Sequence, residues 1–174
     1  MLRHNHPTAI LLPMSDDAPA ADKTSTENRR LLHGATIFAR VALAAAFLSA
    51  VADRFGLWGP PGTPNVGWGN FESFTAYVHV LAPYLSDALL HVAAWGATAV
   101  EILLGVALLL GVALRWVSFA SAATLTVFGV SMFFFAGFET PFSASVFTAA
   151  AAALLLGLAP ESSHIFRLGR ADRA

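Results

Sequence analysis

The stretch ALLHVAAWGATAVEILLGVALLLGVAL, from Ala88 to Leu114, determines the fold class of this chain. Its only titratable side chains are His91 and Glu101, and it ends at Arg115. A helix rises about 1.5 Å per residue, so roughly 20 apolar residues cross the ~30 Å hydrocarbon core of a bilayer. The stretch is long enough for that crossing, and we expect it to form a membrane-spanning helix.

Three further apolar segments surround this one in the sequence. Residues 34–51 contain a single charge, and residues 116–136 and 142–159 contain none. Together with the first stretch they predict an all-α integral membrane protein, a bundle of four transmembrane helices over residues 34–160.

The composition agrees with this class. Of the 174 residues 56% are hydrophobic and 12% are charged, against about 25% charged in soluble domains, and the mean hydropathy is +0.64. A net charge of −1 offers no basic surface for nucleic acid. The absence of cysteine excludes disulfides and any iron–sulfur cluster held by this chain. No metal-ligand spacing is present, so we expect no metal.

The two ends of the chain differ from its middle. Residues 1–33 are rich in charge and proline and predict a disordered N-terminal tail, and residues 161–174 form a second tail. The apolar patch before Pro13 is too short for a secretory signal. Basic residues gather on both tails and at Arg115. The positive-inside rule therefore places both termini in the cytoplasm, in the cell membrane of a bacterium.

Two elements are expected on the opposite, outer side. Residues 56–70 are rich in glycine and proline, with Trp58 and Trp68, and predict an outer loop at the level of the lipid headgroups. Residues 71–86 have apolar side chains at helical spacing and predict a short amphipathic helix in the interface, which Pro83 kinks or ends. An extension of the next helix is the alternative.

Three titratable residues, Arg40, His91 and Glu101, fall inside the apolar segments. A charge at the centre of a membrane helix costs roughly 2.5 to 3.5 kcal/mol, so such groups usually have a partner. Arg40 lies thirteen residues before Asp53 and Glu101 fourteen residues after Asp87, about 20 and 21 Å along two antiparallel helices. These depths predict an ion pair between Arg40 and Glu101.

We expect a polar ligand or proton site around this pair, formed by Arg40, His91, Trp95, Thr98 and Glu101. The alternative is a buried pair that only fixes which helix faces which. No haem is expected, because the only nearby partner for His91 is His79, on the interfacial segment.

Further candidates lie around this site. The expected outer rim consists of Asp53, Arg54, Trp58, Trp68 and Asn70, although Asp53 and Arg54 would also suit a simple water-facing pair. Small residues allow close contact between membrane helices, and we expect this of Gly105 and Gly111.

The order of these features resembles the DoxX-type membrane proteins. The resemblance rests on EILLGVALLLGVALR over residues 101–115, on ADRFGLWGPPG over residues 52–62 and on WGNF over residues 68–71. It covers about residues 34–160. Carried over by position, the polar and glycine residues of the family are Arg40, Glu101, Gly105 and Arg115. The family usually has lysine where this chain has Asp53 and Arg54, so a role of that ammonium group is in doubt here.

The resemblance implies a four-helix bundle in the cytoplasmic membrane, and some relatives are quinone-linked subunits of thiosulfate:quinone oxidoreductase. We therefore expect an accessory subunit of a redox complex, with quinone as the candidate cofactor and other subunits or further copies as partners, more than a stand-alone enzyme. Quinone carbonyls accept hydrogen bonds from arginine or histidine. A non-catalytic scaffold is the alternative, and an oligomeric transporter is the third.

Overall fold

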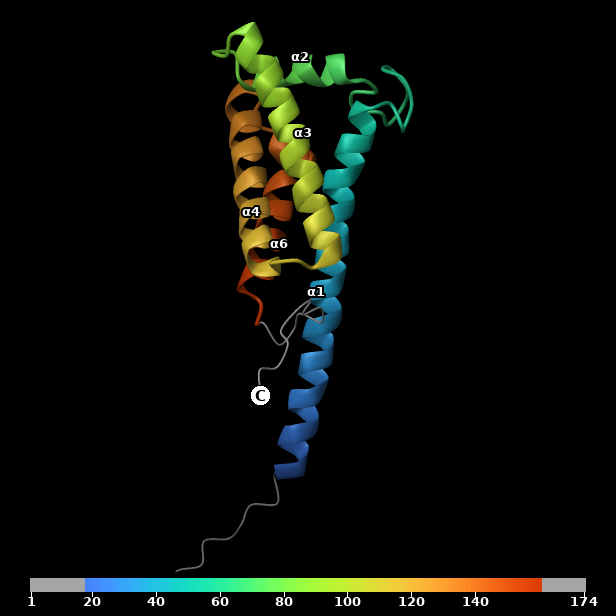
Figure 1. The fold of residues 1–174 in the computed structure, drawn as a ribbon. Helices are drawn as coiled ribbons and strands as arrows, with labels where there is room; N and C mark the ends of the chain where they lie inside the picture. The colour runs from blue at the N-terminus through green and yellow to red at the C-terminus, as the bar shows by residue number, and fades with distance from the viewer. Residues whose placement is uncertain (1–17, 161–174) are drawn as a thin grey trace, which may run out of the picture.

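The computed structural model describes residues 18–160, with side chains from residue 26 onward, and within that range it is helical, without a strand. The elements are α1 (Ala18–Arg54), α2 (Phe71–Leu81), α3 (Asp87–Leu110), α4 (Leu114–Ser131), the π-helical turn η1 (Met132–Ala136), α5 (Thr140–Ser143) and α6 (Val146–Leu158) (Figure 1).

Three of the described helical stretches are long and apolar enough to cross a membrane. They are Thr26–Arg54, Asp87–Leu110 and Leu114–Ala136, the last formed by α4 and η1 together. Helix α6 is apolar but has 13 residues, about 20 Å in length. The prediction of an all-helical fold with helices able to cross a membrane is confirmed for the described residues, and a fourth crossing stays a prediction.

Helix α1 begins earlier than the sequence analysis expects. It starts at Ala18, so residues 18–33 are helical and the prediction of disorder is wrong for them. Residues 1–17 and 161–174, the rest of the two expected tails, lie outside the described residues. The first turn of a helix is unfavourable to form, but adding residues to an existing helix is not. The apolar part of α1 can therefore extend toward the N-terminus through good helix formers such as Arg29 to Leu32. This part of α1 projects beyond the other helices (Figure 1).

Helices α1 and α3 form one closely packed pair. A Cβ atom built on Gly105 of α3 would lie 2.9 Å from Cγ of Leu48 on α1, so only glycine allows this approach. Gly111 ends α3 with a φ of 69° and donates its backbone N–H to the carbonyls of Ala107 and Leu108. Gly111 also makes a close contact with α1, because a Cβ atom there would clash with the guanidinium group of Arg40. Both glycines thus have the predicted packing role, and the second also caps the helix.

Helices α4 and α6 form a second pair, packed in the same manner. A Cβ atom on Gly129 of α4 would lie 2.7 Å from a ring carbon of Phe147 on α6, and a Cβ atom on Gly157 of α6 would lie 2.9 Å from Phe119 on α4. Each helix therefore receives a phenylalanine ring of the other at a glycine.

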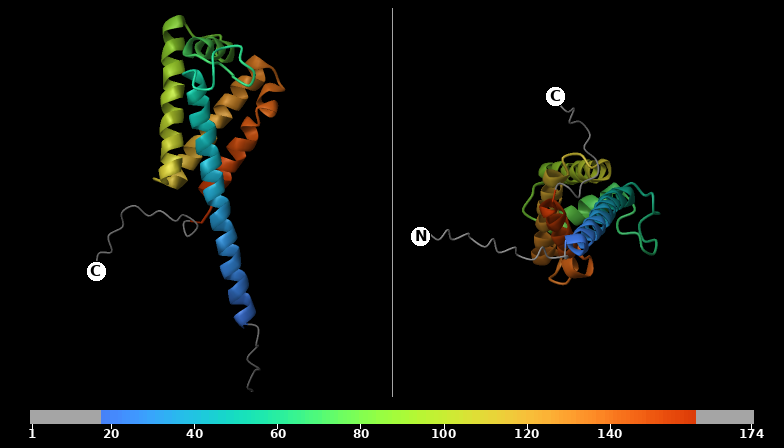
Figure 2. Two further views of the ribbon diagram at one scale, coloured as in Figure 1. Left: turned by 90° about the vertical axis from the view of Figure 1, so that its right-hand side faces the viewer. Right: turned by 90° about the horizontal axis from the view of Figure 1, so that it is seen from below.

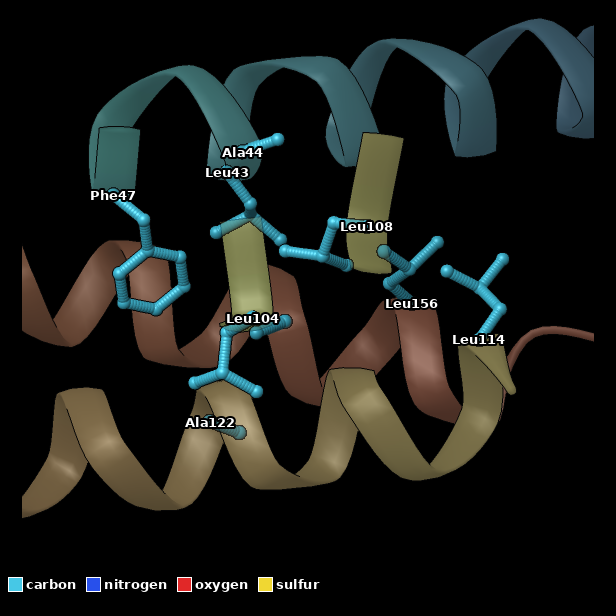
Figure 3. Close-up of a cluster of buried hydrophobic side chains, with 9 residues drawn as sticks. Leu43, Ala44, Phe47, Leu104, Leu108, Leu114, Ala122 and Leu156 are labelled. Atoms are coloured by element: carbon cyan, nitrogen blue, oxygen red, sulfur yellow. The ribbon is translucent and has the colours of Figure 1, made fainter. Parts of the chain in front are cut away.

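The two pairs meet in an apolar core near the turn between α3 and α4 (Figure 3). The core residues are Leu43, Ala44, Phe47, Leu104, Leu108, Leu114, Ala122, Ala153 and Leu156. Most are leucine and alanine, and their side chains fill this end of the structure. The opposite end of the helices is covered by α2 instead.

Helix α2 lies across that opposite end (Figures 1 and 2). The Oδ1 of Asn70 accepts from the backbone N–H of Ser73 at 2.7 Å and caps its first turn. The helix ends at Leu81, two residues before Pro83, which lacks the N–H that a continuing helix needs. It is therefore shorter than the expected segment 71–86 and separate from α3, which begins at Asp87.

Candidate functional site

A buried ion pair joins α1 to α3 near the middle of α3. The Nη2 of Arg54 donates to Oε1 and Oε2 of Glu101 at 2.6 and 2.7 Å. Both side chains are 3% exposed. Two charges held in an apolar interior attract each other strongly but also lose their hydration, so each depends on the other for its burial.

Thr98 completes the polar part of the site. One turn before Glu101 on α3, its Oγ1 accepts from Nη1 of Arg54 at 2.9 Å and donates to the carbonyl of Ala94 at 2.9 Å. The guanidinium group is thus bound through both terminal nitrogens to one face of α3. Its orientation is fixed.

Aromatic rings of α2 and the preceding loop cover this guanidinium group. The Cζ of Arg54 lies 3.7 Å from the ring centroid of Phe74 and 5.3 Å from that of Trp68. The two rings contact each other edge to face at 5.2 Å. The cation lies against π faces, an attractive arrangement that excludes water from the pair.

The loop is held in place by the neighbouring residue of α1. The Oδ2 of Asp53 accepts from the backbone N–H of Trp68 at 2.7 Å. A Cβ atom on Gly67 would lie 2.9 Å from this same oxygen, so glycine is needed for the approach. Asp53 therefore positions the Trp68 ring over Arg54.

The predicted ion pair between Arg40 and Glu101 is wrong. Arg40 lies at the other end of α3, where its Nε and Nη2 donate to the carbonyls of Leu108 and Leu109 at 3.2 and 3.3 Å. These carbonyls belong to the last turn of α3, which lacks the N–H donors of a continuing helix, and a cation at a helix C-terminus also interacts favourably with the helix dipole. Arg40 is a cap of α3 rather than the counterion of Glu101.

The error came from the assumption that α1 and α3 end at the same height. The first turns of α3 instead extend past the end of α1, alongside the loop and α2 (Figure 1). Glu101 therefore lies opposite Arg54, the last residue of α1. Arg40 and Arg54 lie fourteen residues apart, on one side of α1, so helical periodicity alone did not separate them.

A cavity of about 540 Å³ adjoins the ion pair between α1, α3, α4 and α6, beneath α2. Its walls are apolar apart from a few groups, among them Arg54, Glu101, Tyr77 and Ser131. This volume lies within the range of small-molecule sites, about 300 to 1,000 Å³, and apolar walls with a few polar groups are typical of them.

The structure also leaves one polar donor of the site without a partner. The Nε of Arg54 is buried and makes no hydrogen bond to any described residue. A buried unpaired donor costs about 1 to 3 kcal/mol.

Burial raises the pKa of the Tyr77 phenol above its ordinary value, so this hydroxyl remains neutral and able to donate at physiological pH.

The other predicted site residues lie elsewhere. His91 and Trp95 are exposed on the outside of α3, where the Trp95 ring stacks on Phe71 at 4.2 Å. Trp58 is exposed, and its Nε1 donates to the carbonyl of Ser49 at 3.0 Å. Asn70 caps α2. The structure therefore brings Thr98 and Glu101 together with three of the predicted rim residues, which are Asp53, Arg54 and Trp68.

Two residues of the site, Phe74 and Tyr77, were not among the candidates. Both belong to the apolar face of the helix expected over residues 71–86. Their helical spacing was a signal that this face packs against something apolar. The sequence did not show that this face covers the helices rather than the lipid.

No family model, no curated protein and no solved structure matches this chain. The resemblance to DoxX-type proteins therefore stays a prediction. Among residues 26–160, no group of three histidine, aspartate or glutamate side chains is placed to hold a metal ion.

Proposed function

We propose that this protein binds a lipophilic quinone in the cavity beside Arg54 and acts as a membrane subunit of a redox complex. The observation that carries the proposal is a largely apolar cavity of about 540 Å³ that is lined by Arg54, whose Nε has no hydrogen-bond partner among the described residues. A quinone carbonyl is an acceptor for such a donor, and its ring is apolar and flat. The aromatic rings of Phe74 and Trp68 at the same place suit a ring of this kind.

The proposal includes a four-helix bundle in the cytoplasmic membrane. Helix α6 is short by itself, and α5 with the residues between them adds to the length available for a fourth crossing. An even number of crossings puts both ends of the chain on one side, which the basic residues assign to the cytoplasm. Helix α2 and residues 56–70 then lie at the outer interface.

In such a complex the protein would hold the quinone and a partner would deliver the electrons. The chain contains no cysteine, so a dithiol or an iron–sulfur cluster would belong to the partner. The resemblance to DoxX-type proteins supports the same role.

Quinone binding can be tested with a residue that fills the cavity. Ala50 lines the cavity one turn before Arg54, and Ala45 is exposed on the same helix. With decylubiquinone added to the purified protein in lipid nanodiscs, Ala50→Phe should weaken saturable binding at least tenfold, and Ala45→Phe should leave it unchanged. Equal binding by both variants, or no more uptake than by empty nanodiscs, would contradict the proposal.

A second candidate is a non-catalytic scaffold, favoured by the engagement of both terminal nitrogens of Arg54 with α3. In that case the pair serves to fix the contact of α1 with α3. Both candidates depend on Glu101 for their stability, but a scaffold would bind no quinone saturably, so the binding measurement separates them.

A further inference from the structure

The cavity is not closed on all sides. Two of the residues that line it are strongly exposed, Tyr84 at 74% and Val127 at 61%, whereas Arg54 and Glu101 at its inner wall are 2% exposed. The cavity therefore runs from the buried ion pair to the outer surface of the molecule.

The opening at Val127 lies between α3 and α4. Ala93 and Ala97 of α3 line the cavity, and so do Val127 and Ser131 of α4. On α3, Ala97 lies roughly 80° around the helix from Gly105, away from the face that packs on α1. Helices α3 and α4 are joined by a short turn at one end and diverge from it toward α2 (Figure 2, left).

The end of this opening nearest to α2 is covered. The rings of Tyr84, in the connection between α2 and α3, and Phe135, in η1, lie 6.1 Å apart. Phe74, Tyr77 and Leu81 of α2 line the cavity from above. The gap at Val127 faces sideways, between two helices long and apolar enough to span the membrane.

We propose that the ligand is a molecule with a hydrocarbon tail that enters sideways from the bilayer between α3 and α4. Its head group reaches Arg54, and its tail extends past Val127 into the lipid. Ala93 and Ala97 determine this access because their small side chains leave the gap open. The inference rests on the proposed quinone site and adds the route and the tail to it.

Helix α3 itself supplies a control. Ala99 is exposed and does not belong to the residues that line the cavity. Ala99→Phe adds the same side chain as Ala97→Phe two residues further along α3, outside the cavity.

The test uses the full chain in nanodiscs with Trp58, Trp95 and Trp116 replaced by phenylalanine. Quenching of the remaining Trp68, which lines the cavity, reports the quinone. The probes are decylubiquinone and its tailless analogue 2,3-dimethoxy-5-methyl-1,4-benzoquinone. We expect at least tenfold tighter binding of the tailed probe. Ala93→Phe/Ala97→Phe should slow or weaken its binding at least tenfold, and Ala99→Phe should not. Ala97→Leu, a smaller change, should give an intermediate effect if the double variant does not fold.

Each outcome has a defined meaning. If decylubiquinone does not quench the unblocked protein saturably, the proposed quinone site itself fails. If it binds but the Ala93 and Ala97 variants bind it equally well, or if Ala99→Phe alone blocks it, the lateral route between α3 and α4 is wrong. Equal affinity for both probes would overturn the role of the tail.

Discussion

Arg54 on α1 and Glu101 on α3 form a buried ion pair in which one nitrogen, Nη2, lies 2.6 and 2.7 Å from the two carboxylate oxygens. The pair closes one end of an antiparallel contact that continues through Leu48 and Gly105 to Arg40 and the carbonyl of Leu108. Contacts nearer to the start of α1 lie nearer to the end of α3, as expected for two antiparallel helices. A single helix register therefore accounts for the contacts of both arginines.

Removal of one partner of the pair should be strongly destabilising. Glu101→Gln keeps the shape of the side chain but leaves the Arg54 cation buried without a counterion, which costs about 3 to 5 kcal/mol in comparable cases. Unfolding in mixed micelles by titration with dodecyl sulfate measures this loss. Glu139→Gln, at an exposed position, is the matched control. Equal stability of the two variants would contradict the buried pair.

Apolar replacement of both partners should recover most of that stability. Arg54→Met with Glu101→Leu removes both charges together, and such exchanges are often neutral or stabilising. The same double variant should lose quinone binding, because the donor of the site is gone. A stable double variant that still binds decylubiquinone would show that the ligand does not use Arg54.

The register predicts which arginine is energetically coupled to Glu101. In double-mutant cycles, Arg54→Met and Glu101→Gln should deviate from additivity, by about 0.5 to 3 kcal/mol for residues in contact. Arg40→Met and Glu101→Gln should be additive within roughly 0.5 kcal/mol, since Arg40 contacts the carbonyls at the end of α3. Coupling of Arg40 in place of Arg54 would restore the pairing predicted from the sequence.

The contact at Gly105 should tolerate no larger residue. Gly105→Val places a side chain against Leu48, and such overpacking costs about 1 to 3 kcal/mol. Leu48→Ala in the same chain should relieve part of it. Gly96→Val is the matched control, because a Cβ atom at Gly96 meets nothing within 4 Å. The midpoint of thermal unfolding measures all three, and an undisturbed Gly105→Val variant would refute the close contact.

The sequence predicted the membrane class and the ingredients of the site better than their arrangement. The length and the composition of an apolar segment are local properties, and they identified the membrane-spanning parts expected of α1, α3 and α4. The height of one helix relative to another depends on how long each extends and on what covers its end. The first turns of α3 lie alongside α2, past the end of α1. The residues near Asp87 do not indicate this extension. The sequence therefore predicts Arg40 as the partner of Glu101, where the structure has Arg54.

The roles of the tryptophans show the same limit. Trp58, Trp68 and Trp95 all suit an interface by residue type, but the structure places only Trp68 over Arg54. Its position depends on a backbone hydrogen bond to Asp53 across the loop. A contact of this kind joins residues far apart in the sequence, without a periodic pattern to reveal it.

Photolabelling tests the central claim most directly. A ubiquinone analogue with an azide on its ring, irradiated in nanodiscs with the full chain and followed by mass spectrometry of peptides, marks the residues around the bound head group. The account predicts labels in the segments that contain Ala50 to Arg54 and Phe74 to Tyr77, competed by excess decylubiquinone. Labels confined to exposed residues such as Leu103 and Trp116, without competition, would contradict it.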